Sequence, residues 1–179
     1  NVKTVTNYFE SFRQTVVSIL KKAKFQIGAA GLNVEIDETV IAKRKNNMGR
    51  ILSEIWVFGG ICRETGDRFA LQVPDRTAET LLPLIQEHIA PQSFILIVGP
   101  HTTDQIIPEG YKHFTVNHSK NFVDPKTGSH TQTIERMWRG LKRVKRRYEG
   151  VSREDIDDHI SEYLWRKKKG VQHRNAFPE

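Results

Sequence analysis

The amino-acid sequence predicts an α/β fold in which helices flank a mixed five-stranded sheet. Two observations predict it. Three segments with strand patterning follow one another between residues 32 and 74, separated only by a loop and a tight turn. Two further strand-like segments come after an intervening helix, and two helices follow them. Strands joined by short turns pair antiparallel, whereas strands joined through a helix belong to another part of the sheet, so the sheet should be mixed.

An amphipathic helix opens the chain. Its apolar residues recur at helical spacing over residues 3–23, and the segment ends in the basic run KKAK. The Gly-rich joint QIGAAG follows, and LNVEIDE then alternates apolar and polar residues as a half-buried strand does. In this strand Val34 and Ile36 face one way, and Glu35 and Asp37 share the opposite face.

The middle of the chain supplies four more strands and a helix. The basic, Asn-rich loop VIAKRKNNMGR precedes the strands EIWVFGGICRE and RFALQVP, which the tight turn TGD joins. Residues 76–89 form a helix that contains Pro83. The continuous apolar run SFILIV is typical of a central strand covered on both faces, and HFTVN is a shorter fifth strand.

Two helices complete the pattern. TQTIERMWRGLKRVKRRYEG carries an apolar stripe and ends at Gly150, and a final helix begins near Ser152 and runs to about Trp165. This order of elements is the ribonuclease H-like arrangement, which serves many enzymes that cut or join nucleic-acid phosphodiesters. We expect three parts: a leading helix, a ribonuclease H-like domain, and a C-terminal helix with a basic tail, over residues 1–26, 27–150 and 151–179.

The composition of the chain indicates its cellular compartment and the classes of partner that it can bind. The 179 residues suffice for one domain with a sizeable core, and 37% of them are hydrophobic. The net charge of +7 favours nucleic acid or another polyanion. The single Cys62 excludes an internal disulfide and a Cys-rich zinc site and favours a reducing, intracellular compartment. No apolar run approaches the roughly 20 residues that cross a bilayer, so we expect no membrane association.

Two acids are candidates for metal-assisted phosphodiester chemistry, which needs carboxylates from different elements converging on divalent cations. Asp37 lies on the first strand, and Glu135 lies at the border of the apolar stripe of the helix at residues 131–150. Lys142 follows two helical turns later, so it points the same way as Glu135. The alternatives are that Asp37 is an ordinary exposed strand acid and that Glu135 pairs with Arg139 on a solvated face.

The segments VEIDET, WVFGGICRETG and GYKHFTVNHSKNFVDPKTGSHTQTIERMWRGLK resemble the catalytic domain of Merlin-type DDE transposases and of related bacterial insertion-sequence transposases. The resemblance spans about residues 27–150. It implies that Asp37 and Glu135 are the first and third acids of the catalytic and metal-binding set, with Lys142 as the associated basic residue. An active member would use Mg²⁺ or Mn²⁺.

The second acid of this family is missing from its expected place. Counting without gaps from either side of SFILIVGPHTTDQIIPEGYKH places it at Val98, at the end of a predicted strand. The Trp and Tyr that accompany it in the family fall on Pro100 and Thr103. Valine offers no oxygen to a metal ion, and the surrogate within reach is Asp104, six residues beyond the strand.

We therefore expect a domesticated, catalytically inactive relative that uses no metal cofactor and acts in the nucleus through DNA or through nuclear or chromatin-associated proteins. The resemblance also allows a homodimer. The expected phosphate-binding residues are basic and lie in the loop after the first strand and on one helix: Lys43, Arg44, Lys45, Arg139, Lys142, Arg143 and Arg146. Two alternatives stay open: an active transposase that uses Asp104, and a protein-interaction scaffold without DNA affinity.

Overall fold

The computed structural model describes residues 2–22, 26–42, 54–98, 111–116, 132–147 and 155–168. The chain forms two compact units. The larger unit is Gln26–Arg139, and the smaller one combines Asn1–Phe25 with Gly140–Glu179. The boundary falls inside one helix, so the first half of that helix belongs to the larger unit. The three-part division expected from the sequence stays a prediction.

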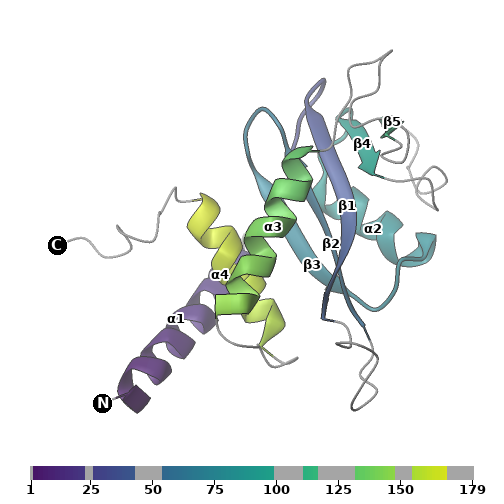
Figure 1. Ribbon diagram of the computed structural model, residues 1–179. Helices are drawn as coiled ribbons and strands as arrows, with labels where there is room; N and C mark the ends of the chain where they lie inside the picture. The colour runs from purple at the N-terminus through teal and green to yellow at the C-terminus, as the bar shows by residue number, and fades with distance from the viewer. Residues whose placement is uncertain are drawn as a thin grey trace. The chain divides into compact units, whose positions relative to one another are not determined.

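The larger unit is built on a mixed five-stranded sheet with the order β3-β2-β1-β4-β5 (Figure 1). Strands β1, β2 and β3 form an antiparallel meander, and β4 pairs parallel to both β1 and β5. The ribonuclease H-like fold expected from the sequence is therefore confirmed. The five strands, in chain order, are Asn33–Ala42, Ile55–Cys62, Arg68–Val73, Phe94–Val98 and Lys112–Val116.

Helices cover both faces of this sheet (Figure 1). They are α2, Ala78–His88, and the first half of α3, Gln132–Arg147. Neighbouring glycines of β2 show the two faces, because side chains alternate along a strand. A side chain at Gly59 would meet Trp138 of α3, whereas one at Gly60 would meet the ring of Phe69. That ring stacks on His88 of α2 with 4.9 Å between the ring centroids. The site described below lies on the α3 face.

The central strands hold the core. Ile95, Leu96 and Ile97 of β4 are at most 1% exposed, as the continuous apolar run predicts. Val34 and Ile36 of β1 are fully buried toward the α2 face. Burying each side chain of this size stabilises the fold by roughly 1.5–3 kcal/mol. The ends of β1 and β4 are thus fixed by packing rather than by flexible loops.

The smaller unit contains α1, Val2–Lys22, the second half of α3, and α4, Ile156–Lys168. Phe12 of α1 packs edge-to-face on Trp165 of α4 with 5.3 Å between the centroids. Helix α4 continues three residues past Trp165 into the segment expected to be a basic tail. No helix in the described ranges combines the length and the apolar character needed to cross a bilayer.

Candidate functional site

Asp37 lies in the middle of the sheet, on β1 between β2 and β4. Burial raises the pKa of Asp37 from its usual 3.8 to about 7, and the nearby carboxylates of Glu38 and Glu135 add to the rise. A hydrogen bond from Trp138 works against it and lowers the pKa. The interpretation of Asp37 as an ordinary exposed strand acid is therefore wrong, because this carboxyl group is largely desolvated.

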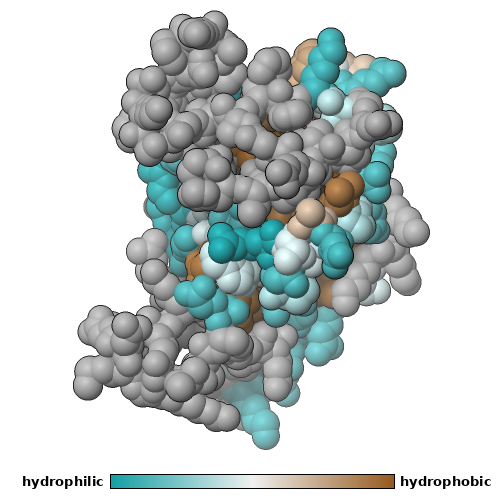
Figure 2. All heavy atoms as spheres, turned by 90° about the vertical axis from the view of Figure 1, so that its right-hand side faces the viewer, coloured by the Kyte–Doolittle hydropathy of each residue, from teal (hydrophilic) through white to brown (hydrophobic). Residues whose placement is uncertain are grey.

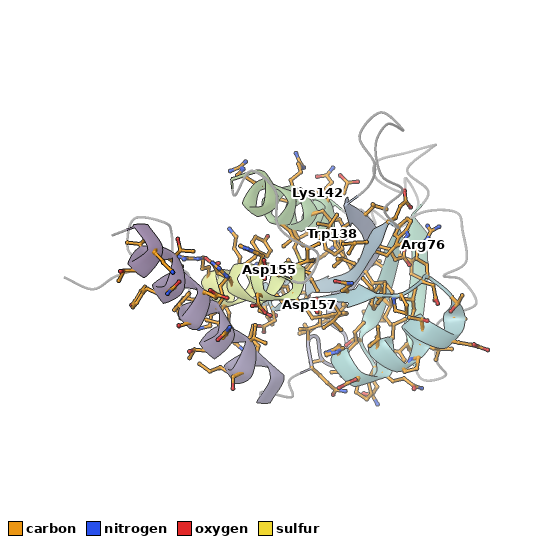
Figure 3. All side chains as sticks on the ribbon, turned by 90° about the horizontal axis from the view of Figure 1, so that it is seen from below. Arg76, Trp138, Lys142, Asp155 and Asp157 are labelled. Carbon is orange, nitrogen blue, oxygen red and sulfur yellow. The ribbon has the colours of Figure 1, made fainter. Side chains whose placement is uncertain are left out.

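Trp138 connects α3 to Asp37. Its indole Nε1–H donates to Oδ2 of Asp37 over 2.8 Å. The side chain of Trp138 lies between α3 and the sheet (Figure 3) and is 5% exposed. Trp138 belongs to the apolar stripe of α3 and is buried. A buried indole N–H needs an acceptor, and Asp37 provides it.

A second contact ties the start of α3 to β1. Glu35 is fully buried, and its Oε2 accepts the backbone N–H of Ile134 over 2.8 Å. Its Oε1 accepts Nε of Arg63 over 2.6 Å. The first amides of a helix lack partners within the helix, and the helix dipole favours a negative charge there. Glu35 therefore serves as an external cap that fixes the first turn of α3 against the strand.

Glu135 lies between these two contacts, one residue after Ile134 and three residues before Trp138. It is partly exposed, and it is close enough to Asp37 to raise the pKa of that residue. The structure thus brings together the two acids that the sequence singled out. They come from a strand and a helix held together at Glu35 and at Trp138.

Val98 occupies the adjacent position on β4. The register pairs Ile36 of β1 with Ile97 of β4 in parallel. The next residues along the two strands are Asp37 and Val98, so they are neighbours across the sheet. Val98 also pairs with Val116 of β5. The backbone position that would bring a second carboxylate beside Asp37 therefore belongs to a residue without an oxygen ligand.

The described residues do not suit a site for two divalent cations. Asp37 and Glu135 are two carboxylates, and the neighbouring strand position supplies none. No group of three or more His, Cys, Asp or Glu residues with metal-binding geometry occurs in the described ranges. The expected surrogate, Asp104, lies outside the described residues, as do Lys43, Arg44 and Lys45. The roles expected for these four residues stay predictions.

Basic residues line an outer face of α3. Arg136, Arg139 and Arg143 are exposed, and their spacing of three and four residues places them on one face of the helix. Lys142 is partly exposed, seven residues after Glu135 on the same helix, and Arg146 lies in its last turn. Hydrophilic residues also make up most of the described surface in the view of Figure 2, where hydrophobic residues show only in small separate areas.

The sequence did not reveal what Glu35 and Trp138 do. The alternation along β1 placed Glu35 on the face of Asp37, but not at the start of a helix about 100 residues later. The apolar spacing of the helix puts Trp138 on its apolar stripe, but this spacing carries no information about the partner of the indole N–H group. In both cases the partner comes from a distant part of the chain.

Comparisons with known proteins found similar sequences. Residues 28–168 match the family model described as ISXO2-like transposase domain. An "Uncharacterized transposase-like protein" of Haemophilus influenzae is 26% identical over 98 residues, which cover 55% of this chain and 78% of that protein.

Two solved structures are also similar. One is a chain of the simian T-cell lymphotropic virus intasome, with a TM-score of 0.49 and 16% identity over 86% of this chain. The match covers 52% of that chain, so the present chain spans about half its length. The other is the catalytic core domain of BIV integrase, with a TM-score of 0.48, 18% identity, and coverage of 75% of this chain and 81% of that one.

Proposed function

The chain belongs to the ISXO2-like transposase domain family, and from this premise we propose that it is a transposase-derived domain that has lost strand chemistry and acts by binding DNA. The observation that carries the proposal is the register of β1 and β4, which makes Val98 the neighbour of Asp37. Two-ion phosphodiester chemistry needs carboxylates that hold both cations a fixed distance apart. A valine at this position removes the ligand expected to serve both.

The electrostatic state of Asp37 makes the binding of a cation depend on pH. A pKa of about 7 means that the carboxyl group holds a proton for about half of the time near neutral pH. A cation must displace that proton before it can bind, so the apparent affinity falls as the pH falls. In a complete site, the charges of the bound ions would offset this cost. With one acid missing, fewer favourable contacts are left to offset it.

DNA binding is supported by charge. The chain carries a net charge of +7, and exposed arginines share one face of α3. Such side chains bind phosphates without reading sequence, and the affinity then falls steeply with salt. None of these residues depends on the missing acid. DNA affinity can therefore persist in a domain that no longer cuts.

We extend the proposal to a Merlin-type, domesticated origin and to action in the nucleus, together with protein partners or a second copy of the chain. The resemblance of the GYKHFTVNHSKNFVDP segment supports the subgroup, and the change at Val98 supports domestication. Imaging of the fluorescently tagged natural protein in its own cells tests the compartment. Exclusion from the nucleus would contradict this part of the proposal.

The proposed function is tested by two assays on one preparation. The first measures binding to a labelled duplex at several salt concentrations, and we expect log K to fall linearly with log salt. The second measures cleavage of the same duplex with Mg²⁺ or Mn²⁺, and we expect none above a sample with chelator. A flat salt response would contradict DNA binding. Metal-dependent cleavage would contradict the loss of chemistry and would direct attention to Asp104.

A further inference from the structure

We infer that Trp138 is a positioning residue that holds the Asp37 carboxylate in one rotamer, and that Gly59 is the residue that makes room for it. The inference deepens the proposed function, on which it rests in one respect: Asp37 is taken as a former metal ligand. We add that the residues that orient Asp37 are still present, although under the proposed function the domain no longer cuts DNA.

Trp138 and Asp37 are in direct contact. Trp138 donates from Nε1 to Oδ2 of Asp37 over 2.8 Å, and the indole is almost completely buried. An Asp side chain on a strand has several staggered rotamers available. The rigid, buried indole N–H donates to Oδ2 alone and therefore favours one of these rotamers. The main chain of Trp138 is itself fixed, because Glu35 caps the first turn of the same helix at Ile134.

The residue opposite Asp37 on the neighbouring strand has no side chain. Gly59 of β2 is the direct cross-strand partner of Asp37. A Cβ atom at Gly59 would lie 2.6 Å from Cη2 of Trp138 and 2.8 Å from the carbonyl oxygen of Phe69. Neither distance is tolerated, and the second involves backbone that cannot give way cheaply. A side chain at this position would therefore push the indole outward, away from the sheet.

Gly59 and Trp138 act together on Asp37. Gly59 leaves the surface of β2 open beside Asp37, the indole of Trp138 fills that opening, and the indole N–H reaches across to the carboxylate. The acceptor that the buried indole N–H requires is here the carboxylate of Asp37, so one side chain both fills the opening and orients the acid. Hydrogen bonds that orient a ligand in this way typically contribute 10–100-fold to metal affinity.

The deciding experiment uses the natural chain without metal. Three-bond couplings from Cγ of Asp37 to the backbone N and carbonyl carbon, measured by NMR, report the χ1 rotamer. We expect a single rotamer in the natural chain and averaged couplings in Trp138→Phe, which keeps a buried ring but loses the donor. Trp56→Phe is the matched control, and it should leave Asp37 unchanged. Unchanged couplings in Trp138→Phe would overturn the inference.

The role of Gly59 is tested by a pair of neighbours. Gly59→Ala and Gly60→Ala introduce comparable crowding on opposite faces, since a Cβ at Gly60 would lie 2.6 Å from Cε1 of Phe69. Both variants should lose stability, but only Gly59→Ala should average the couplings of Asp37. Equal effects of the two variants on Asp37 would overturn the assignment of Gly59. Failure of Gly59→Ala to fold would overturn the assignment of a specific role to Gly59, and Trp138→Phe alone then tests the positioning role.

A Mn²⁺ titration separates this inference from the proposed function. Val98→Asp should bind Mn²⁺, and Val98→Asp with Trp138→Phe should bind it about 10–100-fold more weakly. Equal affinities would overturn the positioning role. If Val98→Asp binds no Mn²⁺ while Trp138→Phe averages the couplings, the role given to Val98 in the loss of the metal site fails and the positioning role stands.

Discussion

The two sides of the candidate site differ in how they are supported. On the β1 side, Asp37 is bonded to Trp138, and Glu35 holds the start of α3, which carries Glu135. On the β4 side, the adjacent position is Val98, which provides no ligand. Both sides belong to the same buried sheet, so the difference is one of chemistry and not of fold.

Under the proposed function, this difference means that the residues that orient Asp37 were kept while a metal ligand was lost. Hydrogen bonds at Glu35 and Trp138 are buried, and their removal leaves unsatisfied polar groups. They therefore contribute to stability whether or not the domain cuts DNA. Valine has no polar group in its side chain, so position 98 contributes no hydrogen bond of this kind. Substitutions on the two sides should consequently behave in different ways.

Among substitutions on the β1 side of the site, Glu35→Leu should have the largest effect on stability. This change leaves the partly exposed Arg63 guanidinium and the N–H of Ile134 without their acceptor. Removing one partner of a buried ion pair typically costs about 3–5 kcal/mol, and the partial exposure of Arg63 puts the expected loss at the lower end of this range. We expect a loss of this size in the free energy of unfolding, measured by denaturant titration. Glu35→Leu with Arg63→Met should recover part of the loss, whereas a loss below about 1 kcal/mol in the single variant would contradict the account.

A second prediction concerns pH and Asp37. Because its pKa is about 7 in the folded state and 3.8 is its usual value, the folded protein holds a proton that the unfolded chain has released between these pH values. The free energy of unfolding therefore falls as the pH rises from about 4 to 7. At about 1.4 kcal/mol per pKa unit, Asp37→Asn should be more stable than the natural chain at pH 8 by up to about 4 kcal/mol.

The stability of Asp37→Asn and of the natural chain should converge near pH 4, where both side chains are neutral. Denaturant unfolding between pH 4 and pH 8, with a chelator present, measures the difference. Asp157→Asn on α4 is the control, since Asp157 is exposed and its removal should leave no such trend. A difference between Asp37→Asn and the natural chain that does not change with pH would be evidence against a buried, protonated Asp37.

The smallest expected effect concerns DNA. Arg139→Gln with Arg143→Gln removes two exposed charges from one face of α3. Each lost phosphate contact should reduce the slope of log K against log salt by about one. Fluorescence anisotropy with a labelled duplex measures the slope. Lys3→Gln on α1 removes one charge and is the control, and an effect about half as large as that of the pair would mean that only net charge matters.

The fold could be predicted because its signals are local. The apolar run at residues 93–98 indicated a buried central strand, and Ile95, Leu96 and Ile97 are buried. The end of β1 was predicted too early. Its pairing with β2 continues through an irregularity after Val40 as far as Ala42. The basic, Asn-rich residues that follow Ala42 led to the prediction of a loop and hid the last residues of the strand, which pair with β2.

The candidate site could be predicted only in part. Asp37 and Glu135 were recognised from strand and helix patterns together with a family resemblance. The partner of Trp138 lies 101 residues away in sequence, and the partner of Glu35 lies 99 residues away. Such contacts depend on how α3 packs on the sheet, which no local pattern contains.

We propose that Val98 is the residue that separates this domain from a metal-binding site. A calorimetric Mn²⁺ titration of the natural chain beside Val98→Asp, at a pH above 7 so that Asp37 is ionised, tests it most directly. We expect no specific binding by the natural chain and a defined site in the variant. Binding of two ions by the natural chain would contradict the account.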